Sequence, residues 1–211
     1  MDTSFINEII AVAKRLDEKN LVNAFEGNIS AKKDGLIYIT PTTKNKGMLT
    51  EDMIAVINED GEQIHGNCKP TSELMMHTAA YQIRDNIGGM VHCHPTFLTA
   101  HAICGMPVET RSYPEMIANF LKFEVAPYGR PGTEDIIANA VPVLKRDDVV
   151  LLGNHGALAV GRTATEAMNK MEAAEAIAKT LYYARLLGKP LDLEESEYQL
   201  FIDIFSKNHA Y

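Results

Sequence analysis

The stretch Met90-Val91-His92-Cys93-His94-Pro95 predicts a strand that runs out of the core into a functional site. Side chains two residues apart on a strand point to the same face, so His92 and His94 can approach one atom together. Two neutral imidazoles at that spacing suit a divalent metal such as Zn²⁺, which normally takes four ligands. Pro95 lacks a backbone donor and has a fixed φ, which suits the first turn of a following helix. The alternative is two strand histidines that only pack or face water.

A third histidine stands in Asn154-His155-Gly156, between two short apolar stretches that predict strands. Gly156 allows a backbone geometry that other residues resist, so His155 can turn toward His92 and His94. Three protein nitrogens with one open position are typical of a catalytic rather than a structural zinc site. The alternative is a turn histidine that makes one backbone hydrogen bond.

Pro70-Thr71-Ser72-Glu73 stands where a helix over residues 72–84 is expected to begin, with Thr71 or Ser72 as its N-cap. Two hydroxyls and free backbone N–H groups at a helix start match an anion such as phosphate. Glu73 has three interpretations. It can be a fourth metal ligand, a general base, or a first-turn acid that only favours the helix dipole.

Two further loops carry small polar groups of the kind that hold phosphate through backbone amides and hydroxyls. They are Gly27-Asn28 and Thr40-Pro41-Thr42-Thr43. Both are also ordinary turn chemistry, so neither loop identifies a phosphate site without the other motifs.

The remaining pattern predicts hairpins early in the chain and helices throughout. Asp34-Gly35 and Glu59-Asp60-Gly61 indicate two hairpins, and Thr163-Ala164-Thr165-Glu166 is a capping box for a long helix that stops at Gly188-Lys189-Pro190. Further helices are expected over residues 5–19 and 72–84. Another should follow the strand over 89–94 and end at about residue 104, and one more should begin at residue 133. The expected strands span residues 28–32, 36–40, 54–57, 63–65, 89–94, 123–128, 149–153 and 157–160. This order predicts a mixed, partly antiparallel sheet with helices on its faces.

The composition is that of a soluble globular protein, with 46% hydrophobic and 23% charged residues. At 211 residues we expect a single domain over 1–211 with a substantial core. The net charge of -8 argues against a nucleic-acid or anionic-membrane surface, but not against one electropositive pocket. No membrane-spanning run and no signal peptide are expected. The three cysteines follow no framework pattern, which predicts reduced thiols in a cytoplasmic protein.

Taken together, these motifs resemble the class II aldolase/adducin family, and within it the L-fuculose-phosphate aldolases. The matching elements stand in the family's order and span most of the chain. They are Gly27-Asn28-Ile29-Ser30, Thr40-Pro41-Thr42, Pro70-Thr71-Ser72-Glu73, His92-Cys93-His94-Pro95, Ala126-Pro127-Tyr128 with Gly132-Thr133, and Asn154-His155-Gly156. The ordered set is far more specific than any one of its members.

The resemblance implies a three-layer αβα sandwich with a central, largely antiparallel sheet, and a homotetramer with active sites at subunit interfaces. It implies that His92, His94 and His155 hold a metal, usually zinc, with Mn²⁺ or another divalent transition metal as alternatives. Glu73 matches the residue that ligates the resting metal and then acts as acid/base. The residues that fall where the family holds phosphate are Gly27, Asn28, Thr42, Thr43, Thr71 and Ser72.

Further site residues follow from the resemblance alone. Tyr113 aligns with a tyrosine that reaches a neighbouring subunit's site and protonates the aldehyde oxygen. Glu115 falls where the family's methylthioribulose-1-phosphate dehydratases carry a catalytic glutamate. His209 or Tyr211, in the C-terminal tail, can also contribute there. A surface loop is the structural alternative for Tyr113 and Glu115.

The implied activity is reversible cleavage of a ketose 1-phosphate, such as L-fuculose 1-phosphate or a related deoxy or pentulose 1-phosphate, to dihydroxyacetone phosphate and an aldehyde. The alternatives on the same fold are the dehydratase, a phosphosugar-acid decarboxylase and a non-enzymatic adducin-like interaction module. Two residues depart from the closest aldolases: Thr43 replaces a glycine and Glu26 a small residue. His77, four residues after Glu73 on the same helix face, is expected to support or pack rather than ligate.

Overall fold

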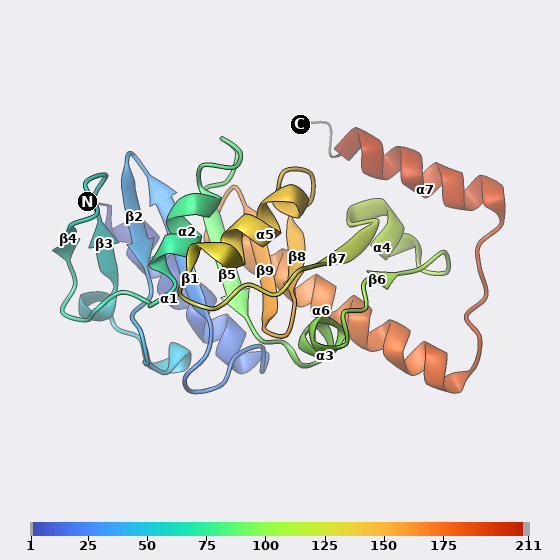
Figure 1. Ribbon diagram of the computed structural model, residues 1–211, viewed down its shortest axis with the longest axis horizontal. Helices are drawn as coiled ribbons and strands as arrows, with labels where there is room; N and C mark the ends of the chain where they lie inside the picture. The colour runs from blue at the N-terminus through green and yellow to red at the C-terminus, as the bar shows by residue number, and fades with distance from the viewer. Residues whose placement is uncertain (1, 209–211) are drawn as a thin grey trace.

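One nine-stranded sheet forms the centre of the computed structural model, which describes residues 2–208 (Figure 1). The strands are β1 Asn28–Lys33, β2 Leu36–Ile39, β3 Ala55–Ile57, β4 Gln63–His65, β5 Gly89–Cys93, β6 Val108–Glu109, β7 Lys122–Ala126, β8 Val149–Leu152 and β9 Gly156–Gly161. They lie in the order β4-β3-β2-β1-β5-β9-β8-β7-β6. Within the described residues only β7 and β8 pair in parallel, which confirms a mixed, largely antiparallel sheet.

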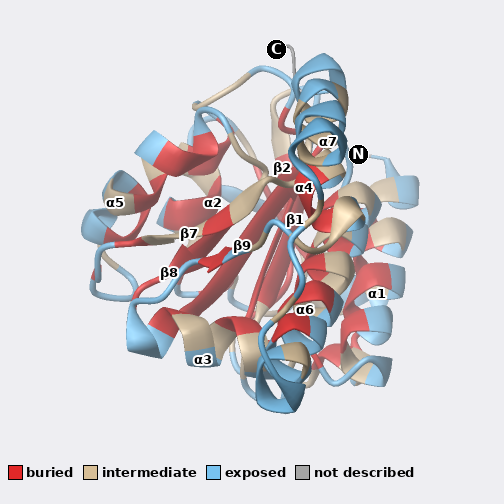
Figure 2. Ribbon diagram, turned by 90° about the vertical axis from the view of Figure 1, so that its right-hand side faces the viewer, coloured by how far each residue is buried: buried red, intermediate tan, exposed pale blue. Residues whose placement is uncertain are grey.

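Helices cover both faces of this sheet. They are α1 Thr3–Glu18, α2 Leu74–Ala80, α3 Thr96–Cys104, α4 Pro114–Asn119, α5 Glu134–Leu144, α6 Ala164–Leu187 and α7 Glu195–Asn208, with short 3₁₀ helices η1 Lys46–Met48 and η2 Glu51–Met53. Helices α1 and α6 lie on one side and α2 and α5 on the other (Figure 2). The neighbours Met90 and Val91 of β5 belong to the two separate cores, as strand alternation requires. The expected αβα sandwich is confirmed.

Local turn chemistry explains the first hairpin. Asp34 and Gly35 join β1 to β2 with φ of 47° and 77°, and two consecutive positive φ values are what the favoured two-residue hairpin turn needs. The hairpin of β3 and β4 is also confirmed. At the start of α6, the Thr163 side chain accepts a hydrogen bond from the Glu166 backbone N–H, as the capping box predicts.

The start of α2 corrects the sequence-based expectation. The helix begins at Leu74 rather than Ser72, and the residue before it, Glu73, makes no capping bond through its side chain. The reason is tertiary: Pro70 bridges Pro41, and the Thr71 N–H donates to the carbonyl oxygen of Thr40 at 3.1 Å. This pairing holds the segment extended, so helical geometry cannot begin before it ends. Neither Thr71 nor Ser72 is the N-cap.

Three elements near the C-terminal half were not predicted, namely β6, α4 and α7. Helix α7 lies outside the sandwich and packs against α4 (Figure 1). No helix in the described residues combines the length and the apolar character needed to cross a membrane.

Candidate metal centre and active site

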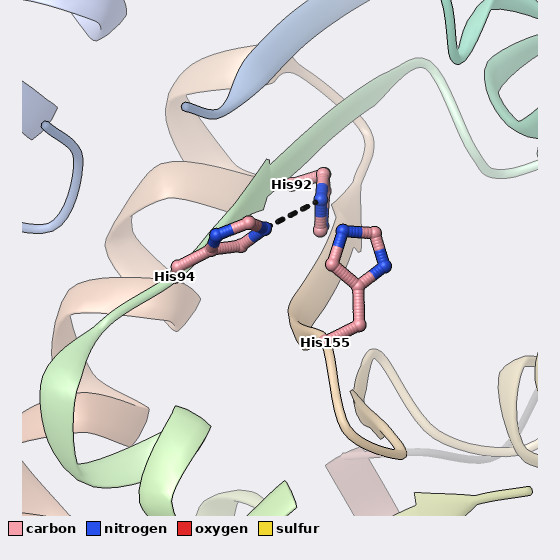
Figure 3. A group of neighbouring side chains, drawn as sticks. All are labelled: His92, His94 and His155. Atoms are coloured by element: carbon pink, nitrogen blue, oxygen red, sulfur yellow. Dashed lines mark hydrogen bonds between the residues drawn. The ribbon is translucent and has the colours of Figure 1, made fainter. Parts of the chain in front are cut away.

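Three histidines converge where β5 meets the turn between β8 and β9 (Figure 3). His92 lies on β5 and is fully buried, and the half-buried His94 follows directly after the strand ends. His155 occupies the turn that precedes β9. The antiparallel pairing places Cys93 opposite Ala157, which brings the turn beside the end of β5. The sequence-based grouping of these histidines is therefore what the fold produces.

Gly156 makes this approach sterically feasible. A Cβ atom at this position would lie 2.4 Å from His94 Cδ2 and 2.7 Å from the Cys93 carbonyl oxygen. Both distances are far below van der Waals contact, so any larger residue would push β9 away from the end of β5. The glycine thus sets the distance between His94 and His155.

The imidazole rings are close enough to share one ion. The ring centroids are 5.0 Å apart for His92 and His94, 4.7 Å for His92 and His155, and 4.8 Å for His94 and His155. The Nε2 atoms of His92 and His94 are separated by 3.3 Å, and one candidate ligand atom from each residue lies within 4.8 Å of the other two. The ring nitrogens therefore surround a common space.

Hydrogen bonding orients the first ligand. His92 Nδ1 lies 2.9 Å from the carbonyl oxygen of Ala157, and a carbonyl only accepts, so Nδ1 carries the proton. The lone pair of His92 Nε2 then faces the shared space, as a metal ligand requires. On the other side, His94 Nδ1 lies 3.4 Å from a carboxylate oxygen of Glu26.

Glu73 completes the cluster from the start of α2. Its Oε2 atom lies 3.4 Å from His92 Nε2, and its Oε1 atom lies 3.8 Å from His155 Nε2. Oε2 also accepts a hydrogen bond from Asn28 Nδ2 at 2.7 Å. Glu73 Oε1 and His155 Nδ1 are buried without a hydrogen-bond partner in the described residues. Orphaned buried polar atoms are rare and point to a missing partner.

A directional hydrogen-bond chain supports Glu73 from behind. Asn28 Nδ2 donates to the carboxylate, so Asn28 Oδ1 accepts from His77 Nε2 at 2.5 Å. His77 Nδ1 then accepts from Ser30 Oγ at 2.6 Å, and Ser30 accepts from the Tyr81 hydroxyl at 2.6 Å. Burial lowers the pKa of His77 to about 3, so the ring is neutral, as this chain requires. His77 supports the site, as expected, rather than ligating.

The protonation states suit metal binding. Burial, followed by the nearby His92, lowers the pKa of His155 to about 4, and the same two causes lower the pKa of His94. Burial alone would raise the pKa of Glu73, but His92, the Asn28 hydrogen bond and His155 together hold it below its usual value. Near neutral pH His94 and His155 are therefore neutral imidazoles and Glu73 is an ionised carboxylate, which are the forms that coordinate a metal. Three nitrogens and one carboxylate oxygen fit one divalent cation.

A cavity of about 360 Å³ opens beside the histidines, a size that suits a small phosphorylated ligand. The structure brings all six predicted phosphate residues to its wall. The lining residues are Phe25, Glu26, Gly27, Asn28, Pro41, Thr42, Thr43, Lys46, Thr71, Ser72, Glu73, His94, Pro131, Gly132 and His155. Thr43 has a φ of 54°, so this threonine adopts the left-handed backbone conformation that normally favours glycine.

The comparisons with known proteins agree with this geometry. Residues 7–182 match the class II aldolase and adducin N-terminal domain family. The chain belongs to this family. The L-fuculose phosphate aldolase of Methanococcus vannielii is 36% identical over 174 residues, covering 82% of this chain and 93% of the relative. The 5-deoxy-D-ribulose 1-phosphate aldolase of Bacillus thuringiensis serovar kurstaki is 31% identical and covers 90% of each chain. A solved L-fuculose 1-phosphate aldolase superposes with a TM-score of 0.88 at 30% identity and 98% coverage of both chains.

Class II aldolases are metal-dependent lyases, and the cluster of His92, His94 and His155 is where this family member can hold its metal. Three lining residues, Phe25, Lys46 and Pro131, were not predicted from the sequence, and only Lys46 among them is charged. A lysine shortly after the Thr42-Thr43 loop was the available signal, but a lysine in a polar loop is usually solvated.

The structure does not bring Tyr113 and Glu115 to the histidines of the same chain. Both line a larger cavity of about 750 Å³, beside α6, that shares no lining residue with the histidine cavity. The larger volume of this cavity does not mark it as the reaction site, because the candidate metal ligands and phosphate-binding residues line the smaller cavity. Glu115 is exposed in the first turn of α4. A role for either residue in a neighbouring subunit stays a prediction. His209 and Tyr211 lie outside the described residues.

Proposed function

We propose that this protein is a zinc-dependent class II aldolase that reversibly cleaves a ketose 1-phosphate to dihydroxyacetone phosphate and an aldehyde. The main support for the proposal is that a candidate metal site and a candidate phosphate site lie side by side. His92, His94, His155 and Glu73 surround one point, and the hydroxyls of Thr42, Thr43, Thr71 and Ser72 line the adjoining cavity. L-fuculose 1-phosphate or a related deoxy or pentulose 1-phosphate is the proposed substrate, in line with the names of the two aldolase relatives.

The roles of the chain's own groups follow from their placement. When bound, a divalent metal supplies a Lewis acid for the charge that develops on the ketose oxygens as the C3–C4 bond breaks. The ionised Glu73 is placed to exchange the proton at C3 of the dihydroxyacetone phosphate half. Asn28 holds this carboxylate in position. The hydroxyls that line the cavity orient the phosphate away from the reacting bond.

We further propose a homotetramer in which Tyr113 protonates the aldehyde oxygen in a neighbouring subunit's site. Supporting this, several large apolar side chains are exposed on the C-terminal half of α6, at the end of α3, with which α6 is in contact, and in the loops that follow these two helices. The exposed side chains are Ile103, Met106, Tyr182, Tyr183, Leu186, Leu187 and Leu191. Patches of this kind mark protein–protein interfaces.

The decisive experiment is a substrate panel on metal-loaded protein. Ketose 1-phosphates are offered with and without their phosphate, and dihydroxyacetone phosphate is measured by coupled reduction. Release from one of them supports the aldolase. Loss of water from methylthioribulose 1-phosphate would indicate the dehydratase, and release of carbon dioxide from a phosphorylated sugar acid the decarboxylase. Absence of both bound metal and turnover would favour an adducin-like interaction module.

Metal content is tested separately. His155→Ala should lose most of the bound zinc measured by elemental analysis, because the remaining site has one imidazole fewer. His65→Ala, on edge strand β4, is the matched control and should keep it. Equal zinc in both variants would contradict the proposed metal site.

A further inference from the structure

Lys46 is an unusual residue in the wall of the histidine cavity. It begins η1, and only 1% of its surface is exposed although lysine side chains normally reach solvent. It lines the same cavity as Thr42, Thr43 and Ser72. Its neighbour Lys44, two residues earlier, is exposed and does not line the cavity.

The ammonium of Lys46 has no counter-charge among the described residues. Its Nζ donates to the carbonyl oxygen of Lys44 at 2.7 Å, but within residues 2–208 no carboxylate lies within 4.0 Å of it. An ammonium has three donors, and a buried charge without a partner is costly to maintain. Burial lowers the pKa of Lys46 to about 8, as expected for an ammonium that is removed from solvent without a compensating charge.

The charge distribution in the cavity suggests what balances this ammonium. Among the described lining residues, Lys46 is the only lysine or arginine, whereas Glu26 and Glu73 add negative charge. Glu26 and Glu73 together offset the charge of the divalent metal that the proposed function places here, so a dianionic phosphate still needs a fixed positive charge to balance it. Hydroxyls alone supply hydrogen bonds but no net charge.

We propose that the Lys46 ammonium is the counter-charge for the substrate's phosphate and makes this enzyme selective for phosphorylated sugars. The inference rests on the proposed function for the identity of the substrate, but not for the anion site itself. The competing explanation is structural: Lys46 could serve only to tie η1 to the preceding loop through the Lys44 carbonyl.

The test measures inorganic phosphate binding to the zinc-loaded protein by calorimetry. Lys46→Met removes the charge at similar length, and Lys44→Met is the same change on the exposed neighbour. We expect the dissociation constant for phosphate to rise about 10- to 100-fold in Lys46→Met, in the range of a lost hydrogen bond to a charged group, and to stay unchanged in Lys44→Met. Lys46→Arg should retain most of the affinity, because it keeps the charge.

Kinetics then separate charge compensation from loop support. In Lys46→Met, KM for the ketose 1-phosphate should rise more than kcat falls, and the preference for phosphorylated over unphosphorylated ketose should shrink by a similar factor. Lys46→Gln, which also lacks the charge, is a second test of the same loss. Thermal melts of every variant show whether a folding defect, rather than the missing charge, explains weaker phosphate binding.

Two results would overturn the inference. One is unchanged phosphate affinity in a folded Lys46→Met protein. The other is equal weakening in Lys46→Met and Lys44→Met, which would indicate general loop disturbance. If phosphate binding depends on Lys46 but no ketose phosphate is cleaved, the proposed function fails and the anion site stands.

Discussion

The carboxylate of Glu73 lies 3.4 Å from His92 Nε2 and 3.8 Å from His155 Nε2, and it accepts a hydrogen bond from Asn28. Glu73→Gln should stay folded but lose about 10²- to 10⁴-fold in rate, the usual cost of losing a positioned acid or base. Its charge at a short helix start contributes at most about 1 kcal/mol to stability through the dipole. Measured kcat, thermal melting and zinc content together check this prediction.

Glu115→Gln is the control for that experiment, because it removes a second carboxylate that lines a different cavity. It should leave aldol cleavage nearly unchanged. Near-normal kcat in Glu73→Gln, together with an inactive Glu115→Gln that releases no dihydroxyacetone phosphate, would instead assign the acid/base to Glu115 and favour the dehydratase.

The buried ammonium of Lys46 also predicts a pH-dependent stability. Its pKa falls from 10.5 to about 8 on folding, so between these pH values the unfolded chain binds one more proton than the folded chain. The contribution of Lys46 to the free energy of unfolding therefore rises with pH across this window, and below it the group costs up to about 3 kcal/mol. Lys46→Met should be more stable than the parent by about 1–3 kcal/mol at pH 7, a gain that fades toward pH 10.

Denaturant unfolding of the two phosphate-free proteins at several pH values measures this difference. Comparing them at each pH cancels the titration of all other groups. A stability difference that stays constant from pH 7 to pH 10 would mean that the ammonium is already compensated in the folded protein and does not need a bound phosphate to balance it.

The close approach of β5 and β9 is what assembles the metal centre. Gly156→Ala would place a methyl group 2.4 Å from His94 Cδ2 and 2.7 Å from the Cys93 carbonyl. We expect zinc affinity to fall about 10- to 100-fold, as when groups that orient ligands are disturbed. Stability should fall by about 1–3 kcal/mol from overpacking.

The same substitution at Gly188 is a suitable comparison, because a Cβ there would meet nothing within 4 Å. Competition with a chromogenic chelator gives the zinc affinity of both variants. If Gly156→Ala binds zinc as tightly as Gly188→Ala does, the separation of the two strands is not what sets the ligand geometry.

Elements with strong local signals could be predicted from the sequence. Asp34-Gly35 encodes its hairpin, and Thr163 caps its helix through a bond to the residue three positions later. His92, His94 and His155 were found because strand spacing and motif order both point to them. For the hairpin and the helix cap, the physical cause lies within a few residues of the effect, whereas His155 is linked to His92 and His94 only through the order of the motifs.

Features created by packing could not be predicted in this way. The start of α2 is delayed by the bridge between Pro41 and Pro70, two residues far apart in sequence. The burial of Lys46 arises because η1 packs against α1, which no local pattern encodes. Helix α7 packs against α4 but has no buried side chain, so its sequence carries no strong core signal, and α4 is only six residues long.

Tyr113 lies apart from the histidines of its own chain, which raises the question of whether one subunit carries a complete active site. Tyr113 lines a cavity beside α6, whereas Glu73 lines the cavity beside the histidines. If Tyr113 acts in a neighbouring subunit, Tyr113→Phe and Glu73→Gln damage different halves of each shared site. Refolding the two inactive variants together at equal concentration should then restore about one quarter of the parent activity, because random closed assembly gives that fraction of sites two intact halves.

Light scattering during the same experiment reports whether the assembly is a tetramer. Mixing without unfolding is the control, since subunits that do not exchange cannot combine their intact halves. Full assembly of two inactive variants with no recovered activity would place Tyr113 and Glu73 in the same chain's site, which would contradict the shared site inferred from the separate cavities that the two residues line. A Tyr113→Phe variant that is active on its own would mean that Tyr113 has no part in the chemistry, and the proton on the aldehyde oxygen would have to come from another group.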